Sequence, residues 1–316
     1  MEVGVILRTG WRAEVPGMPR PEAAFTRLRD EAGAAIAAGA AALFAYDHLE
    51  AVPDSRDAPC FEAWTTLSAL AAAFPGTRIG TLVSGVSLRN TGLLAKMAVT
   101  VDAISGGNVV LGLGAGWYRS ELNHHGIPVL PFAQRAAATG EACQALRALW
   151  AGHPVTAEVG TTMLREAVCA PGPVKGSIPI WIGGSSAAMQ EVAASSADGI
   201  SLGGTPQEIR ALIDSVTCRL ASRQRARERF TFSAEVQVAV SPSDDELSVL
   251  ASRSGTTPED FATWNIVGSP ERILERVAEY QDAGLNMLIA FPPLARSVGD
   301  VAAIIGLVRQ GVRTHA

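Results

Sequence analysis

The stretch Leu111-Gly112-Leu113-Gly114-Ala115-Gly116-Trp117 says most about the fold of this chain. It is an apolar strand that runs directly into a glycine-rich turn and ends in a large aromatic side chain. A second turn of the same kind follows at Pro179-Ile180-Trp181-Ile182-Gly183-Gly184-Ser185-Ser186. Glycine lets the backbone approach a ligand closely or adopt a positive φ. We therefore expect the two turns to form part of a ligand cradle at the ends of neighbouring strands.

Outward from these turns, short β-branched runs alternate with longer helical patterns almost to the end of the chain. We expect strands at Val3–Leu7, Ala42–Tyr46, Arg78–Val83, Val109–Leu113, Ile178–Ile182, Gly199–Leu202, Thr231–Val240 and Met287–Phe291. Apolar residues at helical spacing predict helices at Glu22–Ala38, Phe61–Ala73, Thr91–Ile104, Pro131–Trp150, Ala187–Ser195, Pro206–Ala221, Pro270–Asp282 and Asp300–Arg309. A cap or proline ahead of an acidic first turn marks several of the helix starts, as in Thr205-Pro206-Gln207-Glu208 and Ser269-Pro270-Glu271.

This alternation predicts an α/β fold, a (β/α)8 TIM barrel with short insertions. The strands are mostly continuous apolar runs, which is typical of parallel strands covered on both faces. A doubly wound sheet is the alternative, but it requires a reversal of strand order that the sequence does not show. Two segments exceed a minimal barrel: 152–177, with runs suited to a hairpin, and 241–266, polar with a helical portion. We interpret both as insertions in a single domain spanning residues 1–316.

The composition limits the class of protein. The chain has 316 residues, of which 48% are hydrophobic and 18% charged, and this excludes disorder as the main state. The net charge of −5 argues against a general nucleic-acid binder. The apolar runs are too short to span a bilayer, and the start resembles a strand rather than a leader. The four cysteines form no C-x-x-C pair, so we expect buried thiols in a reducing compartment, and a cytoplasmic protein.

Candidate functional residues follow the strands, because ligands of a barrel lie at the carboxyl ends of its strands. The Gly-Gly-Ser-Ser turn precedes a predicted helix, where free N–H groups suit a phosphate of a cofactor; an ordinary turn capped by serine is the alternative. His48 is suited to proton transfer near neutral pH, the alternative being a hydrogen-bonded structural histidine. The strand-end residues are Asp47 and His48; Leu82, Val83 and Ser84; Ala115, Gly116 and Trp117; and Gly183, Gly184, Ser185 and Ser186.

Other kinds of site receive little support from the sequence. The adjacent His124 and His125 point in different directions on a helix, so we expect no metal site. The third glycine of Gly112-x-Gly114-x-Gly116 comes too early for a dinucleotide fingerprint. The chain has no nucleophile elbow, Walker loop or H-E-x-x-H motif. A site without its own reactive group tends to use that of a cofactor.

Taken together, these residues resemble the bacterial luciferase-like monooxygenase superfamily, and within it the oxidoreductases that use the deazaflavin coenzyme F420. The resemblance covers nearly the whole chain and depends on the order and spacing of several short motifs. These are Tyr46-Asp47-His48, Phe61 to Leu67, Arg78 to Val83, Arg89-Asn90, Ala95-Lys96, Leu111 to Trp117, Glu121, Pro179 to Ser186, Ala197-Asp198-Gly199 and Gly268 to Glu271.

The resemblance implies a (β/α)8 barrel, a homodimer, and roles for individual residues. Asp47 and His48 match residues beside the cofactor ring, and the histidine resembles a proton donor of some deazaflavin dehydrogenases. Leu82-Val83 matches a strand bulge whose cis peptide supports the ring. Ala115-Gly116 and Gly183 to Ser186 match the stretches that hold the cofactor chain and phosphate. We therefore expect His48 to be catalytic, and Ser84 and Trp117 to complete the cofactor site.

Trp117 stands where sugar-phosphate dehydrogenases of this group have a catalytic glutamate, so their substrate is not transferred to this chain. We expect hydride transfer between F420 and a small organic substrate. The alternatives are an FMN-dependent two-component monooxygenase with a separate reductase, a non-catalytic cofactor-binding accessory protein, and a cofactor-free hydrolase or aldolase. We expect the substrate pocket to be lined partly by four variable segments, Thr9–Pro19, Leu49–Pro59, Gly152–Ser177 and Ser241–Ile266.

Overall fold

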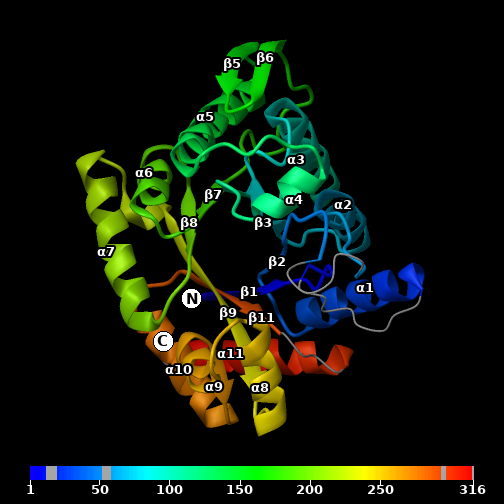
Figure 1. The fold of residues 1–316 in the computed structure, drawn as a ribbon, viewed down its shortest axis with the longest axis vertical. Helices are drawn as coiled ribbons and strands as arrows, with labels where there is room; N and C mark the ends of the chain where they lie inside the picture. Colours follow the sequence, from blue (N-terminus) through cyan, green and yellow to red (C-terminus); the bar gives the residue numbers. More distant parts are fainter. Residues whose placement is uncertain (12–19, 52–57, 293–296, 315–316) are drawn as a thin grey trace.

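A computed structural model of the chain describes residues 1–11, 20–51, 58–292 and 297–314. Within these residues a closed barrel of parallel strands stands at the centre, with helices around it (Figure 1). Neighbouring strands pair in the order β1-β2-β3-β4-β7-β8-β9-β11, and β11 pairs with β1 to close the ring. The barrel strands are β1 (Glu2–Ile6), β2 (Ala42–Ala45), β3 (Ile79–Gly85), β4 (Val109–Gly114), β7 (Ile180–Gly183), β8 (Gly199–Leu202), β9 (Thr231–Val240) and β11 (Met287–Phe291). The predicted (β/α)8 barrel is confirmed.

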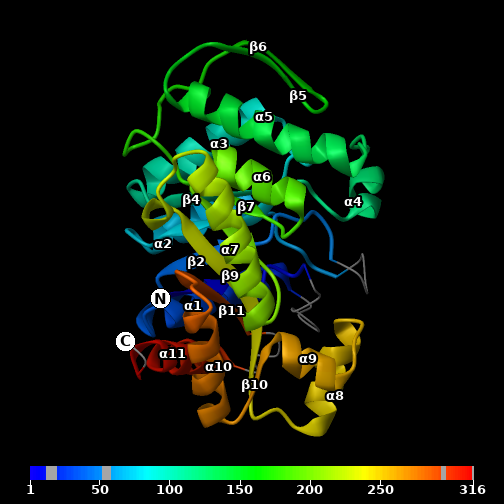
Figure 2. The same ribbon diagram turned by 90° about the vertical axis from the view of Figure 1, so that its left-hand side faces the viewer.

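Long helices connect these strands and cover the outside of the barrel (Figures 1 and 2). Start signals expected from the sequence are present: Thr205 and Glu208 form a capping box at α7, and Ser269 caps α10 ahead of Pro270. The helices around the barrel are α1 (Pro21–Ala37), α2 (Ala63–Ala73), α3 (Thr91–Ser105), α5 (Phe132–Trp150), α6 (Ala187–Ser196), α7 (Pro206–Ser222), α10 (Pro270–Asp282) and α11 (Val298–Thr314), of which α11 follows the last strand.

Two apolar layers hold the barrel together. The larger lies between the outer face of the sheet and the helices, and includes Leu43, Leu111 and Ile305. The smaller fills the barrel interior and includes Phe44 and Trp181, whose rings lie 5.7 Å apart. Both faces of each strand are therefore buried, which explains the unbroken apolar runs in the sequence.

The two insertions lie at opposite ends of the molecule (Figures 1 and 2). Segment 152–177 contains the predicted hairpin, made of β5 (Val155–Val159) and β6 (Thr162–Ala167), which contacts α3 and α5. Segment 241–266 contains α8 (Asp244–Arg253) and α9 (Pro258–Trp264), which precede the short strand β10 (Ile266–Gly268). None of the described helices is both long and apolar enough to cross a membrane.

Two local features differ from the expectation. Strand β3 continues to Gly85 instead of ending at Val83, because a register shift between Thr81 and Ser84 carries the strand past a bulge. A six-residue helix, α4 (Arg119–His124), follows the glycine-rich turn after β4. Such a short helix has too few residues to show helical periodicity in the sequence.

Candidate active site

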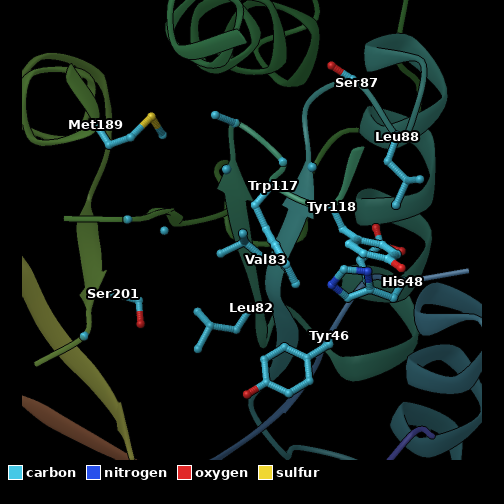
Figure 3. A pocket seen from close by; sticks show the side chains of 18 of the residues that line it. Tyr46, His48, Leu82, Val83, Ser87, Leu88, Trp117, Tyr118, Met189 and Ser201 are labelled. Carbon is cyan, nitrogen blue, oxygen red and sulfur yellow. The ribbon is translucent and has the colours of Figure 1, made fainter. Parts of the chain in front are cut away.

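A cavity of about 510 Å³ opens at the carboxyl ends of the barrel strands (Figure 3). Its lining joins residues that are far apart in the sequence, from the ends of β2, β3, β4, β7 and β8 and from the start of α6. The two glycine-rich turns lie on adjacent strands, because β4 pairs directly with β7. Ten of the predicted cofactor-site residues line it: Asp47, Leu82, Val83, Ala115, Gly116, Trp117, Gly183, Gly184, Ser185 and Ser186.

The bulge of β3 forms the centre of one cavity wall. The peptide bond between Leu82 and Val83 is cis, as the resemblance implies. The Val83 side chain lies between the two glycine-rich turns: a Cβ built on Gly114 meets Val83 Cγ2 at 2.6 Å, and one built on Gly183 meets Val83 Cγ1 at 2.8 Å. Glycine is therefore required at both positions, because the Cβ of any other residue would clash with the Val83 side chain. Gly116 and Gly184 are required for a different reason, since their φ values are +72° and +121°.

The second turn leads directly into α6. Ser186 caps this helix by accepting a hydrogen bond from the backbone N–H of Met189 at 3.3 Å. The first N–H groups of a helix have no intrahelical acceptor, and their partial positive charge favours an anion. Beside them, a Cβ built on Gly203 would meet no atom within 4 Å, so this side of the cavity is open. The arrangement suits a phosphate group.

His48 lines the opposite side of the cavity and is held by Glu121 of α4. The Glu121 Oε2 atom lies 2.9 Å from His48 Nδ1. Its Oε1 atom accepts hydrogen bonds from the backbone N–H groups of Leu49 and Glu50, at 2.7 and 3.2 Å. Burial alone would raise the pKa of Glu121, but the hydrogen bond and charge of His48 and the two backbone N–H groups lower it below the ordinary value. Glu121 is thus a carboxylate, and Nε2 is the His48 nitrogen left to face the cavity.

Asp47 touches the cavity, but its carboxylate is turned into a buried network. Arg89 donates to both carboxylate oxygens, at 2.8 and 2.6 Å, and Ser84 donates to Oδ2 at 2.6 Å. Arg89 also contacts Glu62, the N-cap of α2. Burial alone would lower the pKa of Arg89, but its hydrogen bonds and charge interactions with Asp47 and Glu62 raise it. The network fixes the strand end that carries His48.

Ser84 has a different place from the other predicted cofactor-site residues. It is fully buried beneath Asp47 and is outside the cavity lining. Trp64 Nε1 donates to its hydroxyl at 3.2 Å. In the structure Ser84 therefore supports the site through Asp47.

Several lining residues lie outside the set of site residues that the sequence predicts. Tyr46 at the end of β2 donates a hydrogen bond to Glu235 of β9 across the barrel interior. The sequence does contain a pattern that could have indicated Glu235. In β9, the polar residues Ser233, Glu235 and Gln237 alternate with apolar ones, and a period of two residues places all three on one face of the strand. Ser201 of β8 and Met189 of α6 also line the cavity.

The expectation that variable segments line the pocket is wrong for two of them. No residue of 152–177 or 241–266 is among the lining residues, because the hairpin packs on α3 and α5 and α8–α9 form a small apolar cluster of their own. Of the segment Thr9–Pro19, Trp11 lines the cavity, whereas residues 12–19 lie outside the described residues. Residues 52–57 of the segment Leu49–Pro59 lie outside them as well.

Within the described ranges, no group of three or more His, Cys, Asp or Glu residues is arranged to hold a metal ion. The His124 Nδ1 atom lies 2.9 Å from Glu50 Oε1. This contact joins α4 to the segment that follows β2.

Known proteins resemble the chain in sequence and in fold. The sequence model of the family described as "Luciferase-like monooxygenase" matches residues 1–256. An F420-dependent glucose-6-phosphate dehydrogenase of Microbacterium testaceum is 27% identical over 281 residues, covering 79% of this chain and 82% of that protein. An FMNH(2)-dependent dimethylsulfone monooxygenase of Pseudomonas putida is 22% identical over 237 residues, covering 63% of this chain and 64% of that protein.

The fold has a close counterpart among solved structures. An F420-dependent secondary alcohol dehydrogenase, solved in complex with an F420–acetone adduct, superposes with a TM-score of 0.85, covers 99% of both chains and is 17% identical. At that identity the likeness shows the shared barrel alone. The family model, which matches well over half of the chain, decides the assignment. The chain therefore belongs to the luciferase-like monooxygenase family and is an oxidoreductase.

Proposed function

We propose that the chain binds coenzyme F420 in the cavity and transfers a hydride between this cofactor and a small organic substrate. The proposal depends mainly on the position of His48. Glu121 holds its Nδ1 atom, and its side chain lines the same cavity as Leu82 and Val83. When a hydride moves to or from a carbonyl or hydroxyl carbon, the oxygen must gain or lose a proton. A positioned histidine beside the cofactor surface meets that need.

The residues present fit a deazaflavin. Leu82 and Val83 offer an apolar surface to a flat ring, and the turn from Gly183 to Ser186 with the start of α6 offers N–H groups to a phosphate. Gly203, which also lines the cavity, has open space beside it, because a Cβ built there would meet no atom within 4 Å. Bound there, F420 supplies the hydride chemistry, which the protein's own side chains do not provide.

The chain's own residues prepare His48 for proton transfer. The Glu121 carboxylate keeps the proton of the imidazole on Nδ1, so Nε2 accepts a proton from the substrate side or returns it. The same carboxylate stabilises the imidazolium once both nitrogens are protonated. The Trp11 ring stacks on the imidazole at 4.8 Å with an interplanar angle of 9° and limits its rotation. Asp47 and Arg89 hold the backbone from which His48 projects.

The second candidate is an FMN-dependent two-component monooxygenase supplied by a separate reductase. The FMNH(2)-dependent relative favours it, but the F420-dependent relative matches more of the chain at higher identity, and this supports F420. A homodimer is part of the same proposal, as the family resemblance implies. A cofactor-binding accessory protein without catalytic turnover is the remaining alternative.

The cofactor is tested by titrating the purified protein with F420 and, separately, with FMN, while the cofactor fluorescence is followed. We expect saturable binding of F420. Tight binding of FMN with none of F420 would reverse the order of the two candidates. Bound F420 that no substrate of a broad alcohol and carbonyl panel oxidises or reduces would favour the accessory protein.

The role of His48 is tested by His48→Ala. We expect turnover to fall by roughly 10²–10⁴-fold while F420 affinity stays within a factor of a few, because only proton transfer is removed. The matched control is His153→Ala, since His153 is exposed and is not among the lining residues of the cavity. Unchanged turnover in His48→Ala would reduce His48 to a structural residue.

A further inference from the structure

The second glycine-rich turn is tied to its surroundings by several hydrogen bonds. The Gly184 N–H donates to the carbonyl oxygen of Ser201 at 3.2 Å, and the Gly203 N–H donates to the Ser185 hydroxyl at 3.5 Å. These two bonds join the turn to the end of β8. The carbonyl oxygen of Ser185 has a different partner, a side chain that is not among the residues lining the cavity.

That partner is Gln190 of α6. Its Nε2 atom donates to the Ser185 carbonyl oxygen at 2.8 Å, and its Oε1 atom accepts a hydrogen bond from the Ser215 hydroxyl of α7 at 2.7 Å. The helices α6 and α7 lie side by side on the outside of the barrel (Figures 1 and 2). The glutamine side chain, which is only 6% exposed, therefore links the turn to both helices.

Gln190 is the one polar side chain among the residues that α6 buries, since the others are Met189, Ala193 and Ala194. A buried amide loses its hydration, and this costs free energy unless hydrogen bonds replace it. An apolar side chain of the same size would pack the two helices together without that cost. What the amide adds is a donor for the Ser185 carbonyl and an acceptor for the Ser215 hydroxyl.

The direction of the Ser185 carbonyl determines the direction of the next N–H group. In a trans peptide such as this one, the C=O group and the N–H of the following residue point to opposite sides. Because the carbonyl is held toward Gln190, the Ser186 N–H points away from it, to the side of the turn that lines the cavity. Within the part of the chain that the structure describes, this N–H has no acceptor.

From these observations we propose that Gln190 is a positioning residue of the cavity. It holds the Ser185 carbonyl away from the cavity, so that the Ser186 N–H is presented to an anionic group at the start of α6. The inference rests on the proposed function, in which that anionic group is the phosphate of the cofactor. Without Gln190, the peptide between Ser185 and Ser186 loses the partner that fixes its orientation, and a rotated peptide would turn a carbonyl oxygen toward the anion.

The first test is a fluorescence titration with F420. Gln190→Met keeps the size of the side chain but removes both hydrogen bonds, and the F420 affinity should fall roughly 3- to 10-fold. The matched control is Glu191→Gln. Glu191 is the next residue of α6 and also links this helix to α7, but its partner is Arg219 rather than the turn. Its F420 affinity should equal that of wild type. Equal affinities of Gln190→Met and wild type, or an equal loss in Glu191→Gln, would overturn the proposal.

A pH profile distinguishes positioning from a general loss of stability. In Gln190→Glu, the protonated carboxyl group donates to the Ser185 carbonyl and accepts from Ser215 as the amide does, whereas the carboxylate has no proton to donate. Burial and the facing carbonyl oxygen raise the pKa of this carboxyl group above its ordinary value of about 4.3.

The F420 affinity of Gln190→Glu is therefore measured relative to wild type at the same pH. The ratio should lie within a factor of about 3 at pH 5 and fall roughly 10-fold by pH 8. Gln190→Met, which carries no charge, should show a ratio that does not vary with pH. Circular dichroism at each pH checks that the variants are folded. A constant ratio for Gln190→Glu from pH 5 to 8 would contradict the role of the side chain as a donor to Ser185.

Inorganic phosphate separates this inference from the proposed function. Its binding to wild type and to Gln190→Met without cofactor is measured by isothermal titration calorimetry. If wild type binds phosphate but not F420, the proposed function fails, while a weaker phosphate affinity in Gln190→Met supports the positioning role and an equal one refutes it. If F420 binds to both proteins equally, only the positioning role is refuted. If wild type binds neither F420 nor phosphate, both proposals are refuted.

Discussion

Val83 and Gly114 should be energetically coupled, and the variant Gly114→Ala tests this. The backbone of Gly114 is not in the left-handed region, so alanine is sterically allowed by the backbone itself. The added Cβ would nevertheless meet Val83 Cγ2 at 2.6 Å. Overpacking of this kind typically costs about 1–3 kcal/mol, and we expect Gly114→Ala to lower the free energy of unfolding by that amount.

The second variant, Val83→Ala, removes the atom that clashes. Loss of two partly buried methyl groups should cost about 1–1.5 kcal/mol. In the double variant the next atoms near the new Cβ are Val83 Cβ at 3.7 Å and the Gly183 carbonyl oxygen at 3.8 Å, which are ordinary contacts. The double variant should therefore be no less stable than Val83→Ala, and the coupling between the two sites should be about 1–3 kcal/mol.

The assay is urea-induced unfolding of the four proteins followed by circular dichroism. Gly140→Ala serves as a control. Gly140 lies within α5, and a Cβ added there would make only ordinary contacts with Val192 of α6, at 3.8 and 3.9 Å. It should stabilise the protein by about 0.5–1 kcal/mol. Free-energy changes of Gly114→Ala and Val83→Ala that add within about 0.5 kcal/mol would refute the packing of the bulge against the glycine-rich turns.

Three further outcomes are expected. Arg89→Met removes the ion pair of the buried Asp47 carboxylate, which keeps the hydrogen bond from Ser84, and should destabilise the protein by about 3–5 kcal/mol in urea unfolding. Arg20→Met, at a 72%-exposed side chain, should have no measurable effect. The pKa of Glu121 is lowered in the folded state, so the ionised carboxylate stabilises the protein above its ordinary pKa of 4.5, and this stabilisation is lost as the pH falls through the lowered pKa. On acidification from pH 5 to 3, the free energy of unfolding should therefore fall more in wild type than in Glu121→Gln. Equal losses in the two proteins would contradict this. Burial raises the pKa of the Cys143 thiol to about 12, so a thiol reagent at pH 8 should modify the exposed Cys218 rapidly and Cys143 only on unfolding; a fast phase that survives Cys218→Ser and maps to Cys143 would contradict the buried state.

The barrel was predictable because its strands and helices carry strong local signals. Each barrel strand is a short apolar run, and helix starts such as Thr205 and Ser269 are marked by caps. The two glycine-rich turns were recognised at the correct strand ends. The sequence indicates only part of the reason for glycine in these turns. Gly114 and Gly183 make room for the side chain of Val83, and this contact joins three separate strands, so no single segment encodes it.

The candidate site was less predictable where it depends on contacts between distant residues. Glu121 was recognised as part of a family pattern, but its hold on His48 arises from α4, a helix too short for a periodic signal. The pairing of Tyr46 with Glu235 joins residues 189 positions apart. Ser84 was expected in the cofactor site and lies beneath Asp47, because the bulge in β3 shifts which side chains face the cavity.

The most direct test of the account is a crystal structure of the protein with F420 bound. We expect the deazaflavin ring against Leu82 and Val83, the phosphate within hydrogen-bond distance of the N–H groups at the start of α6, and His48 beside the ring. A phosphate bound away from Gly183 to Ser186, or a ring bound outside this cavity, would contradict the central claim that the two glycine-rich turns and the β3 bulge form the cofactor site.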